Sequence, residues 1–139
     1  MTPDQIALVK ATWAQVLPIQ ETAAGLFYGR LFELAPQTRP LFRGDMTEQG
    51  RKLMAMINVA VSNLDRLGDI LPAIQDMGRR HAGYGVQEAH YDQVGEALLW
   101  TLAQGLGEHF TPAAREAWTA AYGALASAMT EAAQQARVA

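Results

Sequence analysis

The sequence predicts one all-α domain, and three observations support this expectation. The chain has 139 residues, which is enough for one sizeable core and too few for two ordinary domains. Ala, Leu, Gln, Met, Glu and Arg dominate the composition, and all of them favour helices. Apolar residues recur at helical spacing, and no stretch alternates between apolar and polar residues as a half-buried strand does. We therefore expect six or more helices around one core.

Two helices are predicted at the start of the chain. Thr2 as N-cap, Pro3 at the first helical position and Gln5 two residues later match a capping box, so the first helix runs from there to about residue 18. A second helix is expected over residues 21–34, because leucine and phenylalanine recur along one side of it.

A corner and a long helix follow. Pro36 closes the second helix, since the residue before a proline disfavours helical angles, and residues 36–42 indicate a short turn of helix and a corner. Asp45 or Thr47 is available to cap the next helix, which extends over residues 47–64.

The second half of the chain predicts three more helices. Gly68 is expected to break the third helix, and a fourth then covers residues 69–81, ended by Gly83 or Gly85 in left-handed angles. The most hydrophobic helix is predicted over residues 88–106, stopped by a glycine. A final helix is expected to begin at a second threonine–proline signal, at positions 111 and 112.

Composition and charge exclude several classes of function. A formal net charge of −3 gives no basic patch for nucleic acid and no polybasic membrane anchor. The absence of cysteine excludes a disulfide scaffold, a thiol nucleophile and thiolate-bound iron–sulfur or zinc sites. The first residues lack the basic and apolar regions of a signal peptide, and no apolar run is long enough to span a bilayer. We therefore expect a cytoplasmic protein without a membrane span.

His81 is the most informative residue. It follows a leucine- and methionine-rich helical pattern and precedes the stretch A-G-Y-G-V. A neutral imidazole nitrogen, surrounded by apolar side chains, is a suitable axial ligand for an iron porphyrin. The alternative is an ordinary polar histidine near a helix end, which is also the interpretation we favour for His90 and His109.

Several motifs, taken in order, resemble one family. The stretch F-Y-G-R-L-F-E-L-A-P-Q-T-R-P-L-F is similar to the family's second helix and the following corner. Q-G-R-K-L is similar to the wall of the distal pocket, and G-R-R-H-A-G-Y-G-V followed by H-Y-D-Q-V-G-E-A-L-L is similar to the proximal helix and its successor. Over nearly its whole length the chain resembles the globins, most closely bacterial single-domain haemoglobins and the haem domains of flavohaemoglobins. This resemblance implies a globin fold of six to eight helices around haem b (iron protoporphyrin IX).

The resemblance also implies roles for individual residues. His81 would be the iron ligand. Phe42 would stack on the porphyrin, and Lys52 would reach a propionate, although a solvated lysine is an equal alternative. The remaining haem contacts implied by the resemblance are Leu53, Met77, Val86, Tyr91 and Val94. For Met77, Val86 and Val94 a core role and a pocket role coincide.

Tyr28 and Gln49 match the family's distal residues. Gln49 and Leu53 are four residues apart and share one helical face. O2 on ferrous iron carries partial negative charge, so phenol and amide donors would retain it. A buried tyrosine bonded to a backbone carbonyl is the alternative for Tyr28. Gly50 and Ala24 resemble the small pair where two helices cross closely.

The chain departs from the family pattern in two places. Fewer residues separate Phe42 from Gln49 than in flavohaemoglobin-type domains, so the corner is short. On the proximal side, Tyr91 matches a tyrosine that flavohaemoglobins pair with a late glutamate, but Ala133 stands at the matching late position. Glu131 falls on a different helical face, so we expect an incomplete proximal relay.

Three functions are compatible with this pattern. The favoured one is high-affinity O2 binding used for nitric oxide dioxygenation, with electrons from an external reductase. The alternatives are a non-enzymatic O2 carrier, store or scavenger, and a haem-based sensor or interaction module. The expected small ligands are O2, NO and CO, and the expected state is a monomer or homodimer.

Overall fold

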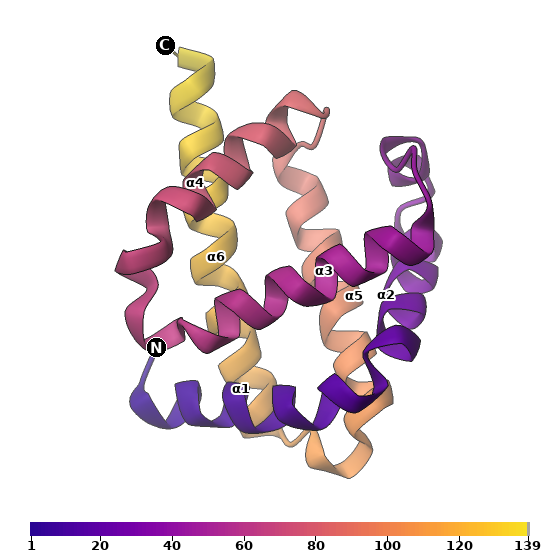
Figure 1. Ribbon diagram of the computed structural model, residues 1–139, viewed down its shortest axis with the longest axis vertical. Helices are drawn as coiled ribbons and strands as arrows, with labels where there is room; N and C mark the ends of the chain where they lie inside the picture. The colour runs from indigo at the N-terminus through magenta and orange to yellow at the C-terminus, as the bar shows by residue number, and fades with distance from the viewer. Residues whose placement is uncertain (139) are drawn as a thin grey trace.

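The computed structural model describes residues 1–138, and these residues form helices without any strand (Figure 1). The six α-helices of this part of the chain are α1 (Pro3–Val16), α2 (Gln20–Leu34), α3 (Met46–Ser62), α4 (Leu67–Gly83), α5 (Glu88–Leu106) and α6 (Pro112–Val138). Short 3-10 turns join them: η1 (Leu17–Ile19), η2 (Pro36–Leu41), η3 (Leu64–Arg66) and η4 (Gly107–His109). The all-α prediction is confirmed.

The predicted helix starts are confirmed by their capping hydrogen bonds. The Thr2 hydroxyl accepts from the Gln5 N–H at 3.1 Å, and the Gln5 side chain accepts from the Thr2 N–H at 3.0 Å. Of the two expected caps for α3, Asp45 is the one used, because its carboxylate accepts from the Thr47 N–H at 3.0 Å. The Thr111 hydroxyl accepts a backbone N–H of α6 at 3.1 Å. Side-chain oxygens therefore replace the missing helical acceptors at these termini.

The prediction that Gly68 breaks the third helix is wrong. The helix ends earlier, at Ser62, and Gly68 lies in the first turn of α4. Asn63 ends the helix instead, since its backbone leaves helical angles and its side-chain amide donates to the Val59 carbonyl at 2.8 Å. Asparagine competes for backbone hydrogen bonds in this way, whereas a glycine near a helix start is tolerated.

Two glycines end helices in left-handed angles. Gly85 follows α4 with a φ of 94°, so it is the one of the two predicted glycines that leaves the right-handed region. Gly107 ends α5 with a φ of 55°. Both angles strain residues that carry a Cβ atom.

Close contacts between helices position the site. In Figure 1, α3 crosses the face of the molecule, and α4 crosses α6 near the C-terminal end. A Cβ atom added to Gly50 would lie 2.9 Å from the Ala24 Cβ, which confirms the predicted close crossing of α2 and α3. A Cβ atom added to Gly78 would lie 2.6 Å from the Cα of Met129, so α4 and α6 touch through their backbones.

The core is built from the faces that these crossings bring together. Its fully buried members include Val9, Leu31 and Leu102, and two tryptophans from α1 and α6 pack with ring centroids 6.1 Å apart. None of the helices described is long and apolar enough to cross a bilayer.

Candidate functional site

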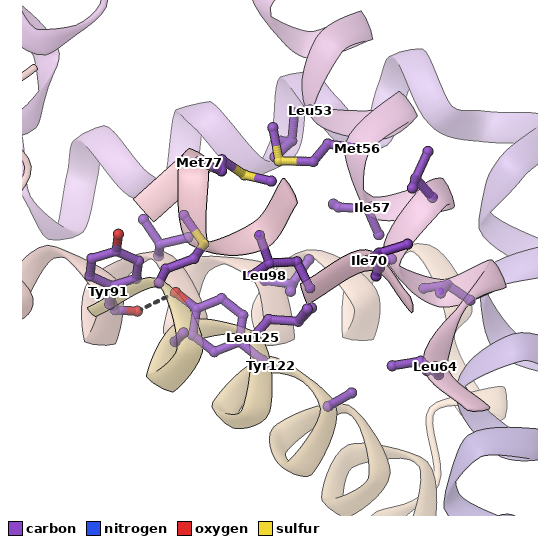
Figure 2. A pocket seen from close by; sticks show the side chains of 18 of the residues that line it. Leu53, Met56, Ile57, Leu64, Ile70, Met77, Tyr91, Leu98, Tyr122 and Leu125 are labelled. Atoms are coloured by element: carbon purple, nitrogen blue, oxygen red, sulfur yellow. Dashed lines mark hydrogen bonds between the residues drawn. The ribbon is translucent and has the colours of Figure 1, made fainter. Parts of the chain in front are cut away.

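An apolar cavity of about 260 Å³ lies between α3, α4, α5 and α6. Figure 2 shows its wall, in which side chains from all four helices point toward a common space. The wall includes Leu53, Met56 and Ile57 of α3, Ile70, Met77 and His81 of α4, Tyr91, Val94 and Leu98 of α5, and Tyr122, Leu125 and Met129 of α6. Helices distant in sequence therefore create one hydrophobic chamber.

Few polar atoms face this chamber, and most of them are already bonded. Among the described residues of the wall, nitrogen or oxygen comes only from the side chains of His81, Tyr91, Trp118 and Tyr122. The Trp118 indole donates to the Thr12 hydroxyl at 2.8 Å, and the Tyr122 hydroxyl donates to the Tyr91 carbonyl at 2.6 Å. The His81 ring and the Tyr91 hydroxyl are the polar groups that remain for a ligand.

The hydrogen bond of His81 fixes its tautomer. Its Nδ1 lies 2.7 Å from the Met77 carbonyl oxygen, one turn earlier on α4. Because a carbonyl only accepts, Nδ1 must donate, and in the neutral ring the lone pair is then on Nε2. A cavity-lining imidazole held in this way is preorganised to ligate a metal through Nε2.

Tyr28 and Gln49 lie together at the α2–α3 crossing. Tyr28 is only 7% exposed, and the Gln49 side chain lies beside its hydroxyl. Burial raises the pKa of Tyr28, and the neighbouring Gln49 side chain opposes this by lowering the pKa.

Phe42 packs against the Tyr28 ring from the corner. Its ring centroid lies 5.3 Å from that of Tyr28 and 5.6 Å from that of Phe32, both nearly edge-on. Tyr28, Phe42 and Gln49 therefore form a cluster next to the cavity, one turn along α3 from Leu53. The short corner does not separate Gln49 from Tyr28.

The predicted residues thus fall into three groups. The cavity wall contains five of them: Leu53, Met77, His81, Tyr91 and Val94. Tyr28, Phe42 and Gln49 form the adjacent cluster. Val86 lines a separate small hollow behind Tyr91, and Lys52 lies exposed on α3.

Comparison with known proteins identifies the family. Residues 25–129 match the family model of the globins, described as Globin. The chain belongs to the globin family. It is 32% identical over 126 residues to a flavohemoprotein of Bacillus subtilis, covering 88% of this chain and 32% of that protein. It is 30% identical to a neuroglobin of Dissostichus mawsoni and 29% identical to one of Chaenocephalus aceratus, covering 89% of this chain and 87% of each neuroglobin. The chain thus spans about a third of the flavohemoprotein.

Globins bind haem and use its iron to bind oxygen, and the residues of this globin fit that group. The donor set is one neutral imidazole nitrogen in a largely apolar chamber, which suits the single protein ligand and the hydrophobic faces of an iron porphyrin.

Position 133 on α6 carries no carboxylate in this globin. Ala133 is buried and lines a hollow of about 10 Å³ together with Tyr91 and Val86. Glu131 is exposed, as its helical phase predicted. Desolvation raises the pKa of Tyr91.

Sequence reasoning missed several wall residues of this globin. Met56 and Ile57 lie one turn after Leu53, and Leu98 lies one turn after Val94, so helical spacing alone was a usable signal for them. Tyr122, Leu125 and Met129 of α6 also recur at helical spacing, but this spacing does not show that they face the cavity.

Proposed function

We propose that this globin holds haem b through His81 and binds O2 with high affinity. The observation that carries the proposal is the His81 imidazole in the cavity wall, with Nδ1 donating to Met77 and the lone pair on Nε2. Ferrous haem supplies reversible binding of O2, NO and CO. The apolar side chains of Leu53, Met77 and Val94 would contact the porphyrin and exclude water from the site.

Tyr28 and Gln49 support the high affinity. Tyr28 is a buried phenol with the Gln49 side chain beside it, so the pair offers two hydrogen-bond donors, a phenol and an amide. In a pocket with little water, such a donor stabilises a ligand whose outer atom carries negative charge. Tyr28 would therefore slow the release of O2 and leave CO, a weaker acceptor, less affected.

We propose nitric oxide dioxygenation as the use of the retained O2. The reaction combines NO, O2 and one electron into nitrate, so each turnover requires an external electron donor or reductase. The flavohemoprotein similarity supports this choice, and it rests on the third of that protein which the chain covers. The role of Tyr28 would be to keep O2 in place until NO arrives.

Binding or storage of O2 without turnover is the second candidate, and Ala133 favours it. A carboxylate at this buried position could polarise Tyr91 and, through it, the proximal histidine, whereas a methyl group cannot. Steady-state NO consumption with a flavin reductase and NADH separates the two candidates. Sustained turnover supports dioxygenation, and a single stoichiometric reaction supports storage.

The haem assignment is tested by reconstitution. We expect a Soret band in the wild-type protein and loss of haem retention in His81→Ala. The control His90→Ala should retain haem, because the His90 ring accepts the Gln87 N–H at the start of α5. Retention of haem by His81→Ala with an unchanged spectrum would refute the assignment.

The distal assignment is tested by O2 release in stopped flow. Tyr28→Phe should release O2 about tenfold to a hundredfold faster, because a donor worth about 1.5–3 kcal/mol is lost. The matched control is Tyr84→Phe, which removes the hydroxyl of a tyrosine that is 67% exposed and does not line the cavity, and it should leave the release rate unchanged. Equal effects of the two variants would show that Tyr28 does not contact the ligand.

A further inference from the structure

The corner between α4 and α5 has the proposed iron ligand at one end and a second histidine at the other. His81 lies in the last turn of α4, which ends at Gly83. His90 lies in the first turn of α5, which begins at Glu88. Residues 84–87 therefore join the two helices, and the bonds of their backbone N–H groups determine how firmly this corner is held.

Backbone bonds hold the first part of the corner to the end of α4. The Val86 N–H donates to the His81 carbonyl at 3.0 Å, and the Gly85 N–H donates to the Ala82 carbonyl at 3.1 Å. The Tyr84 N–H also donates to the His81 carbonyl, at 3.1 Å. The N–H groups of residues 84, 85 and 86 are therefore bonded to acceptors that do not titrate.

The last N–H group of the corner, that of Gln87, is bonded to a side chain instead. It donates to Nδ1 of His90, the third residue of α5, at 3.0 Å. Because an N–H only donates, Nδ1 must hold the lone pair, and in the neutral ring the proton is then on Nε2. A proton added to Nδ1 removes this acceptor. At the start of α1 the same position is taken by Gln5, whose amide accepts the Thr2 N–H at 3.0 Å and does not titrate.

The dipole of α5 acts in the same direction as the lost acceptor. The N-terminus of a helix carries about half a positive elementary charge, so an imidazolium in the first turn is destabilising there. Imidazoles take up their second proton between about pH 8 and about pH 5. The bond from Gln87 to His90 is therefore present at the upper end of this interval and is lost as the pH falls through it.

Other charged groups around the start of α5 do not bind the His90 ring. The charged and titratable side chains on the surrounding elements are Glu88 and Asp92 of α5, Tyr84 of the corner, Arg79 and Arg80 of α4, Glu131 of α6, Arg39 of η2, and Arg30 and Glu33 of α2. The elements α1 and η4 contact α5 at its other end (Figure 1). Glu88 accepts from the Gln134 amide of α6. Among the side chains that the structure describes, none of these groups forms a hydrogen bond or ion pair with the ring, so Gln87 is its partner.

We propose that the bond between Gln87 and His90 is a pH-sensitive latch on this corner, and that acid opens the latch and speeds the loss of haem. The proposal rests on the proposed function, since it concerns how long the cofactor is held. An open latch frees Gln87, the residue next to Val86, whose N–H holds the His81 carbonyl. It also loosens the first turn of α5, which places Tyr91 in the cavity wall. The latch changes the rate at which haem leaves and not the ability of His81 to bind it.

The bond itself is tested by an NMR titration of the purified full chain, as the diamagnetic CO complex where haem is bound. The matched variant is His90→Gln, which keeps an acceptor at the third position of α5, as Gln5 does in α1, and does not titrate. As the pH falls, we expect the Gln87 amide proton to move upfield with the same midpoint as the His90 ring signals. The Gln87 signal should stay fixed in His90→Gln. A Gln87 signal that does not follow His90 in the wild type would overturn the latch.

The consequence for the cofactor is tested by haem transfer to an excess of an acceptor apoprotein. The rate near the acid end of the interval is divided by the rate near the alkaline end, so that protonation of His81, which is common to all variants, cancels between them. We expect this ratio to be about fivefold larger in the wild type than in His90→Gln. The control His109→Gln, at an exposed histidine of η4, should keep the wild-type ratio. Equal ratios in the wild type and His90→Gln would overturn the proposal. If the Gln87 signal follows His90 while no haem spectrum forms, the proposed function fails and the latch stands.

Discussion

The backbone contact between α4 and α6 predicts that Gly78→Ala lowers the stability of the protein. A Cβ atom at Gly78 would lie 2.6 Å from the Met129 Cα and 2.7 Å from its carbonyl carbon, whereas ordinary contacts begin at 3.4 Å. The Met129 carbonyl oxygen would lie closer still, so the helices must separate by more than the 0.8 Å that the Cα atom alone requires (3.4 − 2.6), because the obstacle is backbone and cannot rotate away. His81 lies three residues further along α4 and would move with it.

The expected cost follows from two opposing effects. Overpacking costs about 1–3 kcal/mol, while alanine in a helix gains up to about 1 kcal/mol over glycine. We expect the free energy of unfolding to fall by about 1–2 kcal/mol, which lowers Tm by roughly 3–8 °C in a domain of this size. Thermal unfolding followed by far-UV circular dichroism measures it, and haem transfer to an acceptor protein should be faster as well. The control Gly68→Ala lies on the same helix with no atom within 4 Å of the added Cβ. A Gly78→Ala protein that melts at or above the wild-type temperature would refute the packing argument.

Two further predictions concern buried polar groups. Thr12→Val removes the acceptor of the Trp118 indole N–H and should cost about 1–3 kcal/mol in urea unfolding, whereas Thr119→Val, at an exposed threonine, should cost less than about 0.5 kcal/mol. Burial raises the pKa of Tyr122 and Tyr91 above the ordinary value of 10.0, so these phenols stay protonated in the folded state while they ionise in the unfolded state. The stability that they contribute is fully present below about pH 10 and is lost as the pH rises further. The urea concentration at the unfolding midpoint should therefore fall between about pH 9 and about pH 11. A rise of this midpoint over the same interval would contradict the burial of both phenols.

Local sequence signals predicted those helix starts whose capping hydrogen bonds join residues close together in the sequence. Thr2, Asp45 and Thr111 are caps whose partners lie within three residues, so the sequence contains both halves of each interaction. The prediction at Gly68 was wrong because two nearby residues, Asn63 and Gly68, could each have ended α3. Glycine is a permissive residue, whereas Asn63 forms the bond that ends α3, and composition alone does not show which of the two acts.

Spacing along a single helix predicted which site residues lie on the same face of that helix. Met77 and His81 are four residues apart on α4, and both line the cavity as this spacing predicts, whereas Leu53 lines it and Gln49, four residues earlier on α3, does not. The family resemblance supplied the expectation that Gly50 meets Ala24 across two helices. Helical spacing within α6 does not show that this helix faces the cavity, so Tyr122 and Met129 could be assigned to the cavity wall only from the structure, in which α6 crosses α4.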